Sequence, residues 1–196
     1  MSGAEDLFSQ FDPDTGMITG GKITSRRLSE IRGSFAQPAM VERLLAQGDP
    51  VVYTVASREP ATGEGQLHFG VGRIMPGKVG DEYFLTKGHL HSWRQAAEVY
   101  IGVRGRGKML LQDEESGRST VLDLLPHATV YVPGATAHRT INVGQEPLVY
   151  LGIYPADAGH DYGSIGQTNF SSVVIEQGGE PLVMDRTAYL NRIQRP

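Results

Sequence analysis

Residues 86–111 read TKGHLHSWRQAAEVYIGVRGRGKMLL, and this stretch decides both the predicted fold and the predicted site. His89 and His91 are two residues apart, so an extended strand places both imidazoles on one face. The polar segment Ser92 to Ala97 is short enough for a hairpin loop, after which Glu98 returns on a neighbouring strand. The spacing therefore predicts that two imidazoles and a carboxylate meet in one cavity.

A third imidazole is expected from a more distant strand. His138 lies in VYVPGATAHRTIN, residues 130–142, after a β-rich run and a Pro-Gly turn. Three neutral imidazoles and one carboxylate suit a divalent Fe, Mn, Ni, Co or Zn ion, with positions left open for substrate oxygens. The chain has no cysteine, which excludes thiolate ligands and disulfides. His68 and His127 fall outside this pattern, and we expect them to be solvated or hydrogen-bonded.

Composition narrows the class of protein. The chain has 196 residues, 39% of them hydrophobic, which is ordinary for one globular domain. The net charge of -4 provides no basic surface for nucleic acid, and no apolar run approaches the roughly 18 residues of a membrane-spanning helix. The first residues are acidic and lack the features of a secretory signal. We expect a cytoplasmic protein that acts on a small molecule.

From Val51 onward, short strand-like runs are separated by turns rich in Gly, Pro, Asp and Glu. Many short strands at regular spacing are typical of a β-sandwich or barrel rather than of alternating β-α units. The runs are residues 51–56, 67–74, 83–86, 98–104, 107–112, 119–125, 129–133, 138–142 and 148–154.

The N-terminal region is predicted to be helical. Ser25 to Arg32 and Pro38 to Gln47 carry helical spacing, and Gly48 is a stop signal for the second segment. Neither helix carries visible chemistry. The tail TAYLNRIQRP, residues 187–196, is expected to form a last short helix. We predict one domain, with an N-terminal extension at 1–50, a β-barrel core at 51–176 and a C-terminal tail at 177–196.

Two motifs resemble those of the cupin superfamily. HLHSWRQAAEVYIGVRG, residues 89–105, is similar to the first cupin motif, and PGATAHRTIN, residues 133–142, is similar to the second. Ala135 and His127 replace glycines of the second motif, and the spacer between His91 and Glu98 is longer than in most cupins. Together with YPADAGHDYG, residues 154–163, the long spacer resembles the cupin-type phosphoglucose isomerases of archaea and some bacteria. The likeness runs from about Val51 to Glu176.

The resemblance implies a mainly β double-stranded β-helix (jelly-roll barrel) with an N-terminal helical extension, and it implies a homodimer. It also implies an isomerase of glycolysis and gluconeogenesis that interconverts glucose 6-phosphate and fructose 6-phosphate. The implied cofactor is one divalent metal ion per chain, with Fe²⁺ as the first choice. Glu98 and His160 are the implied catalytic residues. The implied substrate-binding residues are Tyr53, Thr86, Gly88, Tyr100, Tyr154 and Tyr162.

Several alternatives remain open. Tyr53 and Tyr100 lie in apolar runs and could be core aromatic residues, and His160 and Tyr162 could anchor a loop. The chemistry could proceed by proton transfer through a cis-enediolate or by a hydride shift. Two other functions fit the same ligand set: a metal-dependent dioxygenase, and a non-catalytic cupin that binds sugar phosphates.

One departure concerns the phosphate. Val71 and Gly72 lack the hydroxyl side chains that the resemblance implies for this strand. The chain must then use another donor, and Lys87, Arg94 and Arg139 are the nearby cations in sequence.

Overall fold

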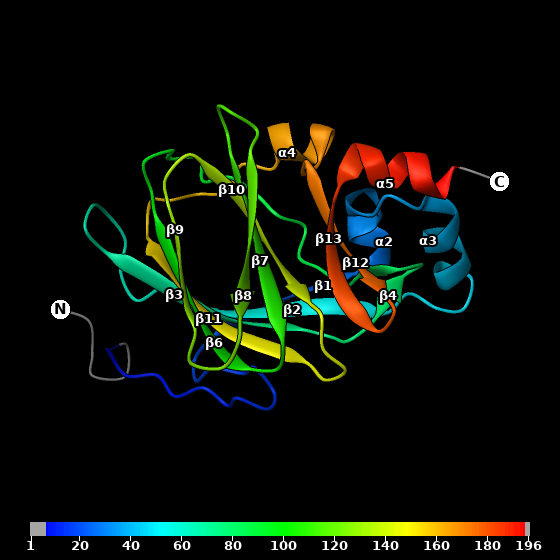
Figure 1. Ribbon diagram of the computed structural model, residues 1–196. Helices are drawn as coiled ribbons and strands as arrows, with labels where there is room; N and C mark the ends of the chain where they lie inside the picture. The colour runs from blue at the N-terminus through cyan, green and yellow to red at the C-terminus, as the bar shows by residue number, and fades with distance from the viewer. Residues whose placement is uncertain (1–6, 195–196) are drawn as a thin grey trace.

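The computed structural model describes residues 7–194, and antiparallel strands are its main regular structure (Figure 1). The largest sheet has the strand order β1-β2-β3-β11-β6-β9. Its strands are β1 Lys22–Arg27, β2 Val51–Arg58, β3 Leu67–Ile74, β11 Leu148–Pro155, β6 Glu98–Arg104 and β9 Thr129–Val132. This sheet supplies one layer of the molecule.

Two smaller sheets supply the opposite layer, with the orders β10-β7-β8 and β13-β12-β5-β4. The first comprises β10 Thr136–Asn142, β7 Gly107–Asp113 and β8 Ser119–Leu124. The second comprises β13 Glu180–Asp185, β12 Ser172–Gln177, β5 Glu82–Tyr83 and β4 Lys78–Val79. Antiparallel bridges Leu85–Ile141 and His89–His138 join the chain after β5 to β10, so the segment that carries the first histidines lies beside the strand that carries the third.

The core fills the space between the layers. One buried cluster joins the large sheet to the sheet β10-β7-β8. It contains Ile74 and Leu148 from the large sheet, and Met109, Leu124 and Ile141 from the smaller one. Alternating strand residues face this core, which explains why the strand-like runs were recognisable from the sequence. The facing antiparallel layers form the expected double-stranded β-helix of a cupin.

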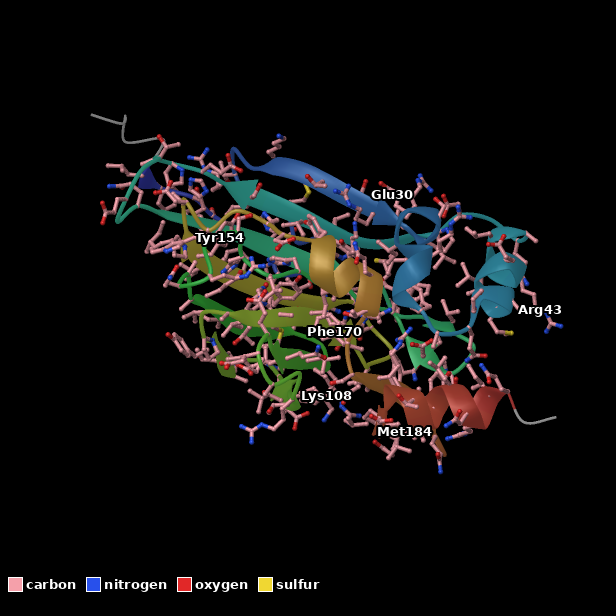
Figure 2. All side chains as sticks on the ribbon, turned by 90° about the horizontal axis from the view of Figure 1, so that it is seen from above. Glu30, Arg43, Lys108, Tyr154, Phe170 and Met184 are labelled. Carbon is pink, nitrogen blue, oxygen red and sulfur yellow. The ribbon has the colours of Figure 1, made fainter. Side chains whose placement is uncertain are left out.

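Helices gather at one end of the strands and beside the small sheets (Figure 1). They are α2 Leu28–Ile31, the 3-10 turn η1 Arg32–Ser34, α3 Pro38–Leu45, α4 Gly163–Thr168 and α5 Arg186–Ile193. In the view from above, α3 with Arg43 lies at the end of the molecule opposite Tyr154 (Figure 2). Among the described residues, no helix is long and apolar enough to cross a membrane.

The helix predicted for Ser25 to Arg32 is wrong over its first residues. Ser25 and Arg26 lie in β1, paired with Thr54 and Tyr53 of β2. Intrinsic helix propensity is a weak preference, and hydrogen bonds to the edge of β2 override it here. The helical part is confirmed only from Leu28.

The other predicted helices are confirmed with small shifts. Helix α3 begins at Pro38, where a missing N–H costs nothing, and Gly48 follows it with a positive φ of 144°. Helix α5 begins one residue before the predicted tail helix, because the side chain of Asp185 caps Ala188 N. Residues 180–185 of the predicted tail form β13, which pairs with β12 along its whole length.

Glu82 gives the fold a pH dependence. Its carboxylate is 2% exposed and accepts a hydrogen bond of 2.6 Å from Ala36 N. Burial raises the pKa of Glu82 to about 7, against the lowering effect of the Ala36 N–H and of Arg186 and Arg139. Because the folded-state pKa exceeds the unfolded value, the stabilisation is present below that unfolded value and is lost as pH rises through about 7.

We therefore expect that the stability of the Glu82→Gln variant no longer falls as the pH rises through about 7. Between pH 5 and pH 8, the unfolding free energy of the unchanged protein should fall by about 3 kcal/mol relative to the variant. Urea unfolding at both pH values measures the difference, with the exposed Glu64→Gln as the matched control. Parallel pH profiles for the unchanged protein and Glu82→Gln would contradict the assignment.

Candidate active site

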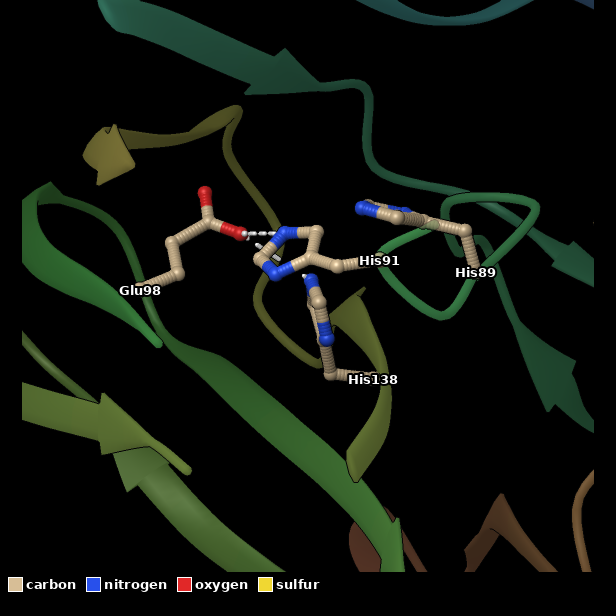
Figure 3. Close-up of side chains that lie close together, drawn as sticks. All are labelled: His89, His91, Glu98 and His138. Atoms are coloured by element: carbon tan, nitrogen blue, oxygen red, sulfur yellow. Dashed lines mark hydrogen bonds and ion pairs between the residues drawn. The ribbon is translucent and has the colours of Figure 1, made fainter. Parts of the chain in front are cut away.

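Four side chains predicted from spacing meet between the two layers. His89 and His91 come from the segment after β5, Glu98 is the first residue of β6, and His138 lies in β10. One nitrogen or oxygen atom from each residue lies within 4.8 Å of those of the other three. Figure 3 shows His91 and His138 turned toward the carboxylate of Glu98. The prediction that these residues converge is confirmed.

Local backbone contacts fix the positions of the four side chains. The His89–His138 bridge contains both reciprocal hydrogen bonds, of 3.2 and 3.0 Å. A tight turn follows His91, in which Ala96 N donates to Trp93 O over 2.9 Å. Glu98 then pairs with Val132 at the start of β6. The long spacer thus reverses the chain and returns the carboxylate to the imidazoles.

The hydrogen bonds of the imidazoles suit a metal ion. His91 Nδ1 lies 3.0 Å from Ala96 O, and His138 Nδ1 lies 3.1 Å from Thr136 O. A carbonyl can only accept, so each Nδ1 carries the proton and each Nε2 presents a lone pair. These Nε2 atoms lie 3.2 and 3.1 Å from Glu98 Oε2. A cation shared by these nitrogens and the carboxylate fits this geometry, and backbone carbonyls commonly orient metal-binding histidines.

Unsatisfied atoms support the same conclusion. The Nε2 atom of His89 is buried and has no hydrogen-bond partner, and the buried Nε2 atom of His138 has only the Glu98 carboxylate, 3.1 Å away. An unpaired buried polar atom costs free energy, so a bound metal ion would satisfy both. His91, Glu98 and His138 are each no more than 5% exposed, which limits competition from water. The residues present therefore fit a divalent metal.

The charges of the cluster differ from those of isolated side chains. Burial acts to raise the pKa of Glu98, but hydrogen bonds and charge interactions with His138 and His91 hold it at about 2. Burial lowers the pKa of His89 well below its ordinary value, as do the neighbouring imidazoles. Glu98 is therefore an anion and His89 is neutral near pH 7, which are the protonation states that metal ligation requires.

A cavity of about 300 Å³ opens beside this cluster. Its wall includes Glu98, His89 and His138. It also includes every predicted substrate-binding residue and the predicted catalytic histidine: Tyr53, Thr86, Gly88, Tyr100, Tyr154, Tyr162 and His160. The structure thus places the predicted residues together around one hollow.

The family model described as glucose-6-phosphate isomerase (GPI) matches residues 25–192. The chain belongs to the glucose-6-phosphate isomerase family. A protein of that name from Pyrococcus abyssi is 48% identical over 181 residues, covering 92% of this chain and 95% of the relative. Its namesake from Thermococcus kodakarensis is 49% identical over 174 residues, covering 89% of this chain and 91% of the relative.

A more distant relative named glucose-6-phosphate isomerase comes from Sinorhizobium medicae. It is 38% identical over 178 residues, covering 90% of this chain and 83% of that protein. The glucose-6-phosphate isomerase family match includes the end of β1 and the helices that follow it, as well as the strands around the cavity. Membership therefore extends beyond the region from Val51 to Glu176 that the motifs indicate.

Alternation along the strands of the large sheet places three of the predicted tyrosines at the cavity. Tyr53 of β2, Tyr100 of β6 and Tyr154 of β11 all face the hollow. Tyr100 is buried, and its ring centroid lies 5.8 Å from that of His138. Burial raises the pKa of both Tyr53 and Tyr154 to about 12, so both hydroxyls keep their protons at neutral pH. These rings are cavity residues rather than core filling alone.

The loop that carries His160 and Tyr162 is held by the residue between them. Asp161 exchanges backbone hydrogen bonds of 3.0 and 2.7 Å with Leu90, and its carboxylate accepts from Arg94 over 2.6 Å. The rings of His160 and Tyr162 stack with centroids 6.0 Å apart. His160 also lies 4.5 Å from His89 between ring centroids. Asp161 anchors the loop, and both neighbouring side chains face the cavity.

Of the three candidate phosphate donors, one lines the cavity and two do not. Lys87 lines the cavity, with its ammonium 4.5 Å from the ring centroid of Tyr162. Arg94 instead pairs with Glu114 and Asp161. Arg139 lies 4.3 Å from the ring centroid of Phe170 and donates to Lys87 O. Arg94 and Arg139 are therefore structural cations, and neither belongs to the cavity wall.

The remaining histidines lie away from the site, in agreement with the sequence prediction. His68 Nε2 lies 2.8 Å from Ala61 O, and His127 is exposed at a turn. Neither lines the cavity.

Sequence reasoning missed several residues of the cavity wall, among them those of one strand and one tyrosine. Lys22, Thr24 and Arg26 alternate along β1 and line the cavity; Arg26 falls in the helix predicted for Ser25 to Arg32, to which no chemistry was assigned. The period of two in KITSRR was an available signal. Tyr150 of β11 also lines the cavity, and its run of apolar neighbours concealed it.

Proposed function

We propose that the protein interconverts glucose 6-phosphate and fructose 6-phosphate at one divalent metal held by His89, His91, Glu98 and His138. Membership of the isomerase family over residues 25–192 is the observation that carries this proposal. The ligand cluster supports it, because its atoms lie within 4.8 Å of one another at the wall of the cavity.

The donor set suits Fe²⁺, which we propose as the native ion, and it also suits Mn²⁺, Ni²⁺, Co²⁺ and Zn²⁺. When bound, the ion supplies positive charge that polarises a carbonyl and stabilises negative charge on substrate oxygens. His91 and His138 are already oriented for ligation by Ala96 O and Thr136 O.

Substrate binding follows from the charges and hydroxyls around the cavity. Lys22, Arg26 and Lys87 supply positive charge that suits the phosphate. Tyr53 lies beside these cations, because it is opposite Arg26 in the sheet and forms a hydrogen bond with the backbone of Lys87. We infer that the phosphate binds near Tyr53, Thr86 and Gly88, which leaves the reacting carbons near Glu98.

Glu98 and His160 are the proposed proton-transfer groups. Glu98 Oε2 faces the imidazoles, whereas Oε1 faces the floor of the cavity above Gly152, where a Cβ atom would lie only 3.0 Å from it. Oε1 can therefore reach a substrate proton. Burial lowers the pKa of His160, so its imidazole is neutral and can exchange protons with sugar hydroxyls.

These residues serve either proposed route. For proton transfer, Glu98 Oε1 takes the hydrogen from C2 and returns it to C1, while His160 adjusts the hydroxyl protons. For a hydride shift, the hydrogen passes directly between the carbons, and the protein groups handle only the hydroxyl protons.

We expect His160→Ala to lower kcat/KM by about 10–100-fold while the metal content stays at one ion per chain. The reason is that His160 faces the cavity without being one of the four clustered ligands. Steady-state kinetics and elemental analysis measure the two quantities. His127→Asn is the control, because His127 is exposed and outside the cavity. Loss of metal in His160→Ala would contradict the assigned role.

The proposed function is tested by a coupled assay of fructose 6-phosphate conversion, with oxygen uptake followed in parallel by an oxygen electrode. We expect glucose 6-phosphate to form without oxygen uptake. Oxygen consumption would favour the metal-dependent dioxygenase, and tight sugar phosphate binding without turnover would favour the non-catalytic cupin.

We also propose a single domain, a homodimer and a cytoplasmic location. The paired sheets and shared core support one domain, because β1 and β13 both extend sheets of the barrel. Symmetric dimers are the commonest oligomers of soluble enzymes. Light scattering on the purified protein measures the oligomeric state directly.

A further inference from the structure

Tyr150 occupies the space above a glycine in the floor of the cavity. The two residues are directly opposite each other, Gly72 on β3 and Tyr150 on β11. On its other side, Tyr150 is opposite Gly102 of β6. The ring leans toward β3, since a Cβ atom on Gly72 would overlap Cζ and Oη of Tyr150 and lie 2.6 Å from Cε2. The hydroxyl thus stands where a side chain of residue 72 would otherwise project.

This hydroxyl is available for a ligand. Tyr150 is only 6% exposed to solvent and lines the cavity. Burial raises its pKa far above the ordinary value, against the lowering effect of a hydrogen bond with Thr140, so the proton is kept. A hydroxyl has one donor and two acceptor positions. The Thr140 hydroxyl, which also lies 3.1 Å from Met109 Sδ, lowers the pKa of Tyr150 as a hydrogen-bond donor does, so it takes an acceptor position and leaves the Tyr150 proton for a phosphate oxygen.

The contacts of Thr140 place this hydroxyl toward the proposed phosphate end. Thr140 N donates to the Thr86 hydroxyl over 3.1 Å, and Thr86 N donates to Thr140 O over 2.9 Å. Thr86 lines the cavity next to Lys87 and Gly88. Tyr100, whose ring centroid lies 5.3 Å from that of Tyr150, separates it from His138.

We propose that the Tyr150 hydroxyl hydrogen-bonds the phosphate of the sugar phosphate, in place of a side chain from residue 72. The inference rests on the proposed function and adds a specificity residue to it. Gly72 is required at its position because any side chain there displaces the tyrosine ring. The two residues therefore act as a pair in which β11 provides the donor and β3 provides the space.

The test uses Tyr150→Phe, which removes the hydroxyl and keeps the ring. We expect KM for fructose 6-phosphate and the inhibition constant of inorganic phosphate both to rise about tenfold, with kcat within about twofold. Tyr131→Phe is the matched control, since Tyr131 is 61% exposed and outside the cavity. Thermal unfolding of each variant confirms that it is folded.

A second variant tests the pairing. Gly72→Ser alone should raise KM, because the new side chain overlaps the ring of Tyr150. Combining it with Tyr150→Val returns a hydroxyl to the same space and should recover part of the lost affinity for phosphate.

The outcomes are distinguishable. An unchanged KM and an unchanged phosphate inhibition constant in an active Tyr150→Phe protein would overturn this inference alone. A raised KM with an unchanged phosphate constant would also overturn it, because the hydroxyl would then contact the sugar chain. Absence of turnover in the unchanged protein with every metal would instead overturn the proposed function.

Discussion

His138→Ala should lose bound metal and isomerase activity together. His138 presents a buried Nε2 atom to the cluster, within 4.8 Å of the ligand atoms of His89, His91 and Glu98. Without the ion, the charge stabilisation worth several kcal/mol is lost, so we expect kcat/KM to fall by about a thousandfold or more. Elemental analysis and the coupled assay measure both effects on the same sample.

The control for this variant is His127→Asn. His127 has a positive φ of 68°, which asparagine tolerates, and it lies at an exposed turn. Metal content and activity should match those of the unchanged protein. An active His138→Ala protein with a full complement of metal would show that the cluster is not the metal site.

Glu98→Gln should separate metal binding from chemistry. The amide keeps an oxygen that can face His91 and His138, so the ion should remain when metal is supplied in excess. The carboxylate charge and its capacity to take a proton are lost. General base catalysis contributes about 10²–10⁴-fold, and we expect kcat to fall by about a thousandfold.

The measurement is single-turnover and steady-state kinetics on Glu98→Gln with the metal content determined in parallel. Glu64→Gln, at an exposed loop position, is the matched control. A metal-loaded Glu98→Gln protein with full kcat would remove Glu98 from proton transfer and leave His160 as the acid-base group.

The metal cluster could be predicted because its information is local. The two-residue period of His89 and His91 fixes their common face, and a short reversal returns Glu98 to the same place. To predict that His138 joins them, it was enough to assume that a distant strand pairs with the segment that carries His89. The His89–His138 bridge is that pairing.

Other features depend on contacts that sequence spacing does not contain. Ser25 and Arg26 are extended because β2 offers an open edge, and no local pattern reports that partner. Arg139 follows His138 directly, yet strand alternation turns it away from the cavity to Phe170. Tyr150 reaches the cavity because Gly72 stands opposite it, a pairing that only the register of β3 and β11 reveals.

The most direct test of the account is the conversion of fructose 6-phosphate to glucose 6-phosphate by chelator-stripped protein, before and after Fe²⁺, Mn²⁺, Ni²⁺, Co²⁺ or Zn²⁺ is added back. We predict no turnover without metal and restored turnover with one ion bound per chain. Full activity in the stripped protein, or one bound ion per chain without any turnover, would contradict a metal-dependent isomerase at His89, His91, Glu98 and His138.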